Sequence, residues 1–145
     1  MPLTVLLVED SPGDVRLTQE ALRSTNNSIH LLTAPDGLEA LALLMRAGSY
    51  VHAPRPDLIL LDLNLPRMDG RTVLAHIKDD PSLKTIPTVI LTSSDEEEDI
   101  VESYQLQANC YLSKPVRLEA FEQLVRSIND FWLTRATLPQ SRLLA

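Results

Sequence analysis

Short apolar runs alternate with stretches of helical periodicity along the chain. Five runs rich in leucine, isoleucine and valine predict strands over residues 3–9, 29–33, 58–62, 88–92 and 109–113. The first, third and fourth runs are almost continuously apolar, which is typical of parallel strands covered on both faces. The alternation of strands with helices predicts an α/β sandwich, a doubly wound five-stranded parallel sheet with right-handed crossovers.

The stretches between these runs carry signals for helix starts. A capping residue is followed three positions later by an acid at three places, the pairs Ser11/Asp14, Asp36/Glu39 and Ser94/Glu97. Apolar residues at helical spacing predict a buried face on the last helix, made of Leu118, Phe121, Leu124, Val125, Ile128 and Trp132. Residues 46–56, which end in two prolines before the third strand, predict a long loop.

Composition limits the classes of function. The 145 residues suit one domain, and 20 acidic against 13 basic residues give a net charge of −7. This acidic balance argues against direct nucleic-acid binding. The single cysteine, Cys110, cannot form an internal disulfide, and the N-terminal apolar run is too short for a signal or membrane segment. We expect a soluble, cytoplasmic domain with neither nucleic-acid nor membrane partners.

Three acids stand at predicted strand ends. Glu9 and Asp10 follow the first strand, and Asp62 ends the third. Sites in open parallel sheets form beyond the carboxyl ends of strands, so these carboxylates converge if the two strands are neighbours. Mutual repulsion then calls for a cation, and an oxygen-only ligand set of modest size favours Mg²⁺. A plain helix cap is the alternative for "ED" alone.

Two further strand ends complete a phosphoryl-binding set. The fourth strand ends at Thr92, a hydroxyl donor, and the fifth leads into Lys114. Mg²⁺, a lysine and a hydroxyl suit the oxygens of a phosphoryl group in transfer, and aspartate is a known covalent acceptor of such groups. Alone, Thr92 carries little information and Lys114–Pro115 indicates only a turn. The prediction depends on all five residues lying at strand ends of one sheet.

These motifs resemble the receiver domain of two-component response regulators. The matching segments are "VED" (8–10), "LILLDLNLPRMDG" (58–70), "VILTSS" (89–94) and "CYLSKP" (110–115), with 30 residues from Asp62 to Thr92 and 22 from Thr92 to Lys114. The resemblance implies the flavodoxin/CheY-like strand order 2-1-3-4-5. It also implies that Asp62 is the phosphoacceptor, charged by a partner histidine kinase.

The resemblance further assigns the metal ligands. Asp10 and Asp62 would bind Mg²⁺ directly, together with the backbone carbonyl of Asn64, and Glu9 would act through water. Glu9 stands where many relatives carry Asp, which is a mild departure from the family pattern.

Switch and tuning roles are implied by the same resemblance. Lys114 would pair with the phosphoryl group, Thr92 would swing to bond it, and Tyr111 would follow inward. The surface formed by the fourth helix, fifth strand and fifth helix would then change for partner binding or relay. Asn64 and Ser94 occupy positions that tune dephosphorylation, and the Lys114–Pro115 peptide is expected to be cis.

The chain is also similar to small stand-alone regulators paired with cyanobacterial phytochromes, through "GSYVHAPRPDLILLDLNLPRMDG" and "SINDFWLTRATLP". That similarity implies a light-sensing kinase as the partner. We expect a receiver domain over residues 1–134, a C-terminal extension over 135–145 and no output domain. We expect no enzyme activity beyond Mg²⁺-dependent self-phosphorylation and slow autodephosphorylation.

The last helix is unusually apolar. Phe121, Phe131 and Trp132 are three of the six aromatic residues, and large exposed apolar groups commonly mark an interface. We therefore predict a homodimer through this end of the chain. The alternative is that residues 134–145 fold back and cover these side chains.

Three other functions compete with a signalling role. A haloacid-dehalogenase-type phosphatase also uses an aspartate at a strand end with Mg²⁺, but it needs a second acid where this chain has Asn64. A flavodoxin-like FMN carrier needs a phosphate-cradling loop after the first strand, where "EDSPGD" offers carboxylates instead. A degenerate receiver acting as a scaffold would lack the full set of acids, hydroxyl and lysine.

Overall fold

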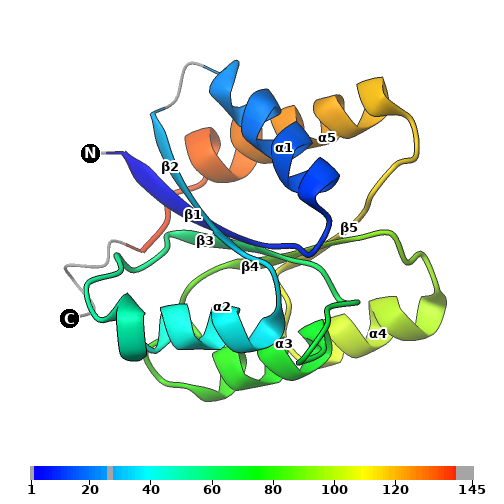
Figure 1. Ribbon diagram of the computed structural model, residues 1–145. Coiled ribbons are helices and arrows are strands. Elements are labelled where there is room, and N and C mark those ends of the chain that lie inside the picture. Colours follow the sequence, from blue (N-terminus) through cyan, green and yellow to red (C-terminus); the bar gives the residue numbers. More distant parts are fainter. Residues whose placement is uncertain (1, 26–27, 140–145) are drawn as a thin grey trace.

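The structure is a parallel sheet between two layers of helices (Figure 1). It is a computed structural model, and it describes residues 2–25 and 28–139. Five parallel strands pair in the order β2-β1-β3-β4-β5, which confirms the predicted fold. The strands are β1 (Leu3–Val8), β2 (Ile29–Ala34), β3 (Leu58–Leu61), β4 (Thr88–Thr92) and β5 (Cys110–Ser113).

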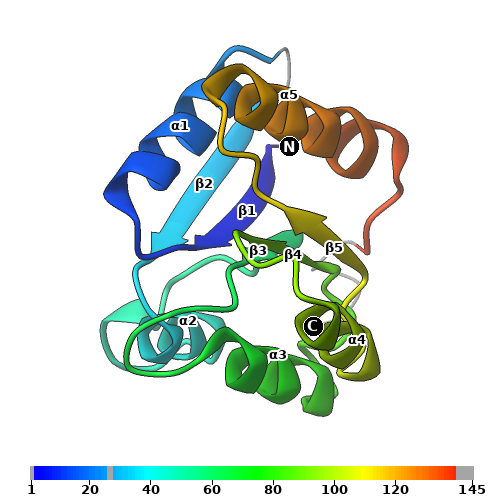
Figure 2. The ribbon, with the colours of Figure 1, turned by 90° about the vertical axis from the view of Figure 1, so that its right-hand side faces the viewer.

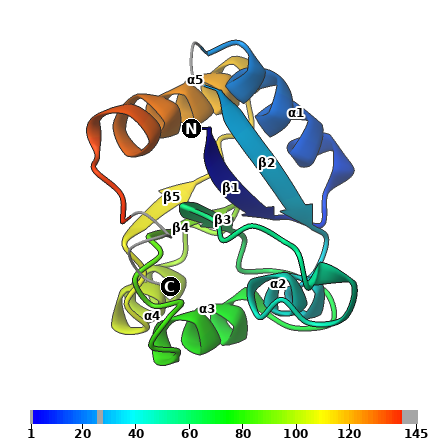
Figure 3. The same cartoon turned by 90° about the vertical axis from the view of Figure 1, so that its left-hand side faces the viewer.

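The helices divide between the two faces of the sheet. Figures 2 and 3 show two of them on one face, α1 (Pro12–Arg23) and α5 (Leu118–Asp130). The other face carries α2 (Gly37–Leu44), α3 (Gly70–Asp79) and α4 (Glu97–Gln105). The 46–56 segment is not wholly irregular, because Gly48–Tyr50 form a short 3₁₀-helix. None of the described helices combines the length and apolar character needed to cross a bilayer.

Apolar packing on both faces explains the continuous hydrophobic runs. All residues of β3 and β4 are buried, and alternate side chains point into two separate clusters. One cluster includes Ile59 and Leu61 and lies under α2 and α3, while the other includes Leu58 and Leu60 and lies under α1 and α5. Burial on this scale contributes roughly 25 cal/mol per Å² of apolar surface. The strands are therefore fixed, and their carboxyl ends form a rigid edge.

Two of the three predicted helix caps are confirmed. The Ser11 hydroxyl accepts a hydrogen bond from the Asp14 amide at 3.3 Å, and the Asp36 carboxylate accepts from the Glu39 amide at 2.8 Å. The third is wrong, since α4 begins at Glu97 with Glu96 as its N-cap and no side-chain cap. The reason is that the helix starts later than predicted: Ser94 lies two residues before the N-cap, where its Oγ accepts from the Glu96 amide at 3.3 Å and donates to the Asp99 carboxylate at 2.5 Å.

The last helix is only partly as predicted. Phe121, Val125 and Ile128 are buried in the core, but Leu118 is half exposed. Phe121 retains 4% exposure, so its predicted place in an interface is wrong: it fills the space between α5 and the sheet. A π-helical turn, Phe131–Arg135, follows α5.

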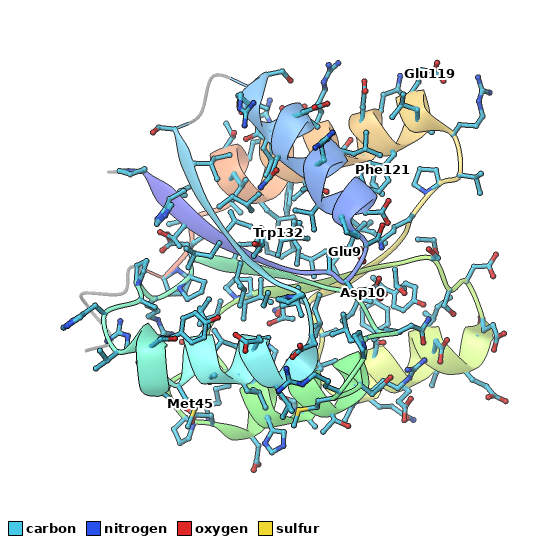
Figure 4. The ribbon with its side chains drawn as sticks, in the orientation of Figure 1. Glu9, Asp10, Met45, Glu119, Phe121 and Trp132 are labelled. Atoms are coloured by element: carbon cyan, nitrogen blue, oxygen red, sulfur yellow. The ribbon has the colours of Figure 1, made fainter. Side chains whose placement is uncertain are left out.

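Phe131 and Trp132 lie on this turn with their rings edge to face, 5.3 Å apart between centroids. Phe131 is 54% exposed, whereas Trp132 packs partly against the core. Figure 4 shows Phe121 and Trp132 on the α1–α5 side of the sheet. Residues 140–145, which belong to the segment predicted to cover the aromatic side chains, lie outside the described residues.

Candidate functional site

Three carboxylates meet at the carboxyl edge of the sheet. Glu9 and Asp10 follow β1, where Figure 4 shows them at its end, and Asp62 follows β3. The two strands are neighbours in register, with Val8 opposite Leu61, so their ends coincide. Carboxylate oxygens of Glu9, Asp10 and Asp62 all lie within 4.8 Å of one another. The predicted convergence is therefore present in the structure.

Lys114 joins this cluster from the end of β5. Its Nζ donates to Asp62 Oδ2 at 2.9 Å and to Asp14 Oδ2 at 3.0 Å, and it also pairs with Glu9. The Lys114 side chain is 6% exposed, so a single buried ammonium is shared by three acids.

Asp14 was missed as a member of the site, because its spacing from Ser11 predicted only a helix cap. Its position in the first turn of α1 could have revealed it, since that turn follows the end of β1 directly.

Thr92 contacts Asp62 from the end of β4. The Thr92 hydroxyl is fully buried and donates to Asp62 Oδ1 at 2.7 Å. The backbone amide of Asn64 donates to the same oxygen at 3.3 Å. A buried hydroxyl needs a partner, and Asp62 supplies it. The expected swing of Thr92 toward a phosphoryl group stays a prediction, and in this structure its hydroxyl already points toward Asp62.

Tyr111 is also directed inward. It is half buried against the core, and its hydroxyl donates to the Ser94 carbonyl at 2.9 Å. We refer to this placement of Thr92 on Asp62 and of Tyr111 on Ser94 as the inward arrangement. A short path of contacts therefore leads from the carboxylate at β3 through β4 to the start of α4.

The Lys114–Pro115 peptide bond is trans, so the expected cis form is wrong. A trans bond is the ordinary preference before proline, by about 0.5–1 kcal/mol. The backbone is still anchored here, since the Lys114 amide donates to the Thr92 carbonyl at 2.7 Å.

Electrostatics at this edge favour a bound cation. Burial raises the pKa of Glu9 to about 7, although its hydrogen bond to Lys114 acts in the opposite direction. Burial alone would lower the pKa of Lys114, but its bonds to Glu9 and Asp62 outweigh that effect and raise it. Four carboxylates including Asp14 face one ammonium, which leaves a surplus of negative charge. A divalent ion bound by Asp10 and Asp62 would offset this surplus and favour ionised Glu9.

The donor atoms fit a hard divalent ion. All three clustered side chains offer oxygen, and Asp10 is exposed, so an ion could keep several waters. The metal role of Asn64 stays a prediction. Its predicted ligand atom is the backbone carbonyl, and its backbone amide bonds Asp62 Oδ1 at 3.3 Å.

Comparison with protein families identifies the domain. The family model described as "Response regulator receiver domain" matches residues 5–126. The chain belongs to this family. Receiver domains bind a divalent metal, and the acidic cluster of this receiver domain fits one.

Individual relatives extend the family assignment. The response regulator Rcp1 of Synechocystis sp. strain PCC 6803 is 51% identical over 138 residues, covering 95% of this chain and 94% of that protein. The crystal structure of the Mn²⁺-bound form of Rcp1 has a TM-score of 0.93 at 50% identity, covering 96% of this chain and all of the other. The similarity to phytochrome response regulators predicted from the sequence is confirmed.

A third relative is a modified protein. The crystal structure of the phosphorylated cyanobacterial phytochrome response regulator RcpA has a TM-score of 0.94 at 51% identity, covering 97% of this chain and all of the other. The fold of this receiver domain is therefore close to that of a regulator that has been observed in its phosphorylated form.

Proposed function

We propose that this receiver domain accepts a phosphoryl group on Asp62 from a histidine kinase, with Mg²⁺ as its cofactor. The observation that carries the proposal is the environment of the Asp62 carboxylate. Lys114 Nζ lies 2.9 Å from one of its oxygens and the Thr92 hydroxyl lies 2.7 Å from the other, with Glu9 and Asp10 beside them. An ammonium, a hydroxyl and an acidic metal site are the groups that phosphoryl transfer requires.

The chemistry follows from these positions. An Asp62 oxygen attacks phosphorus, the bond from phosphorus to the kinase histidine nitrogen breaks, and an acyl phosphate forms. Lys114 binds the transferred oxygens, and Thr92 redirects its hydroxyl to one of them. A metal held by Asp10, Asp62 and the Asn64 carbonyl, with Glu9 acting through water, would neutralise charge on the phosphoryl group.

Exposed neighbours of the buried Asp62 support transfer from a large donor. The Asp62 side chain is 9% exposed, while Asp10 and Asn64 beside it are exposed. A phosphohistidine can therefore approach from the open edge of the sheet. Hydrolysis uses the same opening, and Asn64 and Ser94 flank it where they would tune the lifetime of the acyl phosphate. The protein turns over no external substrate in this scheme.

The partners follow from the relatives. Rcp1 and the phytochrome regulator RcpA are about half identical to this chain, which supports a phytochrome-type histidine kinase as the phosphodonor. The signal would leave through α4, β5 and α5, where Val101, Tyr104 and Leu118 are exposed. The exposed ring of Phe131, packed on Trp132, supports a homodimer contact at the end of α5. Residues 1–134 would form the receiver and 135–145 an extension.

The test is phosphotransfer with a matched variant. The wild-type protein in Mg²⁺ should gain one phosphoryl group, from a candidate kinase or a small phosphodonor, and intact-mass spectrometry should count it. Asp62→Asn should gain none, and a chelator should suppress the reaction in wild type. A phosphoryl group gained by Asp62→Asn would contradict the assignment of Asp62 as the acceptor. Repeated turnover of a phosphate ester would favour a phosphatase instead.

A further inference from the structure

Arg71 connects two helices beside the phosphorylation site. It is the second residue of α3, and its guanidinium reaches α4. Nη1 lies 3.0 Å from Asp69 Oδ1, Nη2 bonds Asp99 in the first turn of α4, and Nε lies 3.1 Å from Glu102 Oε1 one turn later. The Arg71 side chain is 23% exposed and that of Asp99 18%, so these charges are partly shielded from water.

Asp99 continues the chain of contacts toward the switch residues. Its second oxygen accepts the Ser94 hydroxyl at 2.5 Å, and the carbonyl of the same serine accepts the Tyr111 hydroxyl at 2.9 Å. Ser94 stands two residues after Thr92, which bonds Asp62. The contacts from Arg71 to Tyr111 therefore pass through the segment that links the phosphoacceptor to α4. Hydrogen bonds from Ser94 and Arg71 lower the pKa of Asp99, which keeps it ionised.

Helix α4 has few other anchors. Ser103 is its only fully buried residue, and it has no side-chain cap at its start. Glu97, Glu98 and Asp99 in its first turn repel one another, although the helix dipole offsets part of that repulsion. Among the described residues, Arg71 is the only basic side chain that forms an ion pair with α4.

We propose that Arg71 is a positioning residue for the phosphorylation switch. It holds α4 and the 93–96 segment in place, so that the Ser94 carbonyl can accept the hydrogen bond of the Tyr111 hydroxyl. This inference rests on the proposed function, because it assigns to Arg71 the stabilisation of the arrangement that accompanies a phosphoryl group on Asp62. Removing the guanidinium frees Asp99, and Asp99 no longer fixes Ser94. The inward arrangement then loses its support from α4, and phosphoryl binding becomes weaker.

The experiment measures binding of beryllium fluoride, which forms a phosphoryl mimic on a carboxylate, in the presence of Mg²⁺. The variants are Arg71→Gln, Asp99→Asn, the double variant and Arg71→Lys. Arg126→Gln is the matched control, because Arg126 is exposed on α5 and forms no ion pair within the described chain. Mg²⁺ affinity without beryllium fluoride is measured for every protein, since a general structural defect would change it as well.

The expected result is specific. Arg71→Gln and Asp99→Asn should each weaken beryllium fluoride binding by roughly three- to thirty-fold, with Mg²⁺ affinity unchanged. The double variant should be no weaker than either single one, because both remove the same contact. Arg71→Lys should recover part of the loss, and Arg126→Gln should match wild type. Amide exchange of residues 97–105, measured without beryllium fluoride, should be faster in Arg71→Gln.

Other results would overturn the proposal. One is that Arg71→Gln binds beryllium fluoride as tightly as Arg126→Gln does. A second is that Arg71→Gln loses as much Mg²⁺ affinity as beryllium fluoride affinity. A third is that the losses of beryllium fluoride affinity in the two single variants add in the double variant. If wild type itself fails to bind beryllium fluoride, the proposed function and the coupling both fall. Amide exchange then decides separately whether Arg71 holds α4.

Discussion

Helices α5 and α4 are neighbours in sequence order but are held by different forces. α5 buries Phe121, Val125 and Ile128 against the sheet, and α1 packs beside it. α4 buries only Ser103 completely and exposes Val101 and Tyr104. Its first turn is held instead by Arg71 and by the Ser94 hydroxyl. One helix belongs to the core, whereas the other is attached to it by polar groups.

The difference shows where this fold can change. Each fully buried apolar side chain contributes roughly 1.5–3 kcal/mol to the free energy of unfolding, and that contribution is lost if the side chain moves into water. An ion pair near the surface contributes about 0–1 kcal/mol and is directional. Polar contacts can therefore be exchanged at low cost, and in this structure they lie on the path from Asp62 to α4. We expect α4 to respond to modification of Asp62 and α5 to stay fixed.

The largest effect is expected at Gly70, where α3 begins. A Cβ there would lie 2.1 Å from the Asp62 carbonyl oxygen and 2.7 Å from Leu63 Cα, both backbone atoms. Gly70→Ala should displace the first turn of α3, with Arg71 on it, at a cost of about 3 kcal/mol. Urea unfolding measures this cost, and amide exchange should show α4 loosened more than α5.

Gly13→Ala is the matched control for that variant. A Cβ at Gly13 would meet only Ser11 Oγ, at 3.8 Å, so stability should be unchanged or rise slightly. If both variants lost the same free energy of unfolding, the close approach of backbone atoms at Gly70 would not explain the loss.

An intermediate effect is expected from a pair of valines, one on each helix. Val125 on α5 is fully buried and Val101 on α4 is 43% exposed. Val125→Ala should lower the free energy of unfolding by about 2 kcal/mol, because it opens a cavity in the core. Val101→Ala should change it by less than about 0.5 kcal/mol. Similar losses in urea denaturation would erase the distinction between the helices.

The smallest effect is expected from salt. Raising ionic strength from about 0.05 M to about 1 M shortens the screening length from over 10 Å to about 3 Å and weakens the pairs of Arg71. Amide exchange in residues 97–105 should accelerate a few-fold, while exchange in α5 stays constant. Arg71→Gln should remove most of this salt response. A salt response of α5 as large as that of α4 would count against the comparison.

Sequence patterns predicted the fold because β1, β3 and β4 are apolar enough to be buried on both faces and helical periodicity separates the strands. They also brought Glu9, Asp10, Asp62, Thr92 and Lys114 together correctly, since parallel strand ends share one edge of the sheet. The spacing rule used for caps could not separate Asp36, whose carboxylate caps a helix, from Ser94, whose hydroxyl bonds Asp99. The difference is where the helix begins, because α4 starts at Glu97 and so leaves Ser94 two residues before its N-cap.

Other errors came from properties that a linear pattern does not encode. Asp14 serves both its helix and Lys114, a residue 100 positions away in the chain. The interface prediction groups Phe121 with Phe131 because both are large and apolar, but Phe121 on α5 is buried, whereas Phe131 on the π-helical turn is exposed. Helical periodicity placed Phe121 with Val125 and Ile128 on the buried face of the last helix, and that part of the prediction is confirmed.

The buried hydroxyl of Thr92 has one proton to donate, and Asp62 already receives it. Phosphorylation of that carboxylate, which would give an acyl phosphate, would replace one acceptor of this hydrogen bond by another. The contact would then contribute only the difference in strength between the two acceptors. Most of the driving force for a conformational change must then come from charge, namely the extra phosphate oxygens that draw the Lys114 ammonium away from Glu9 and Asp14.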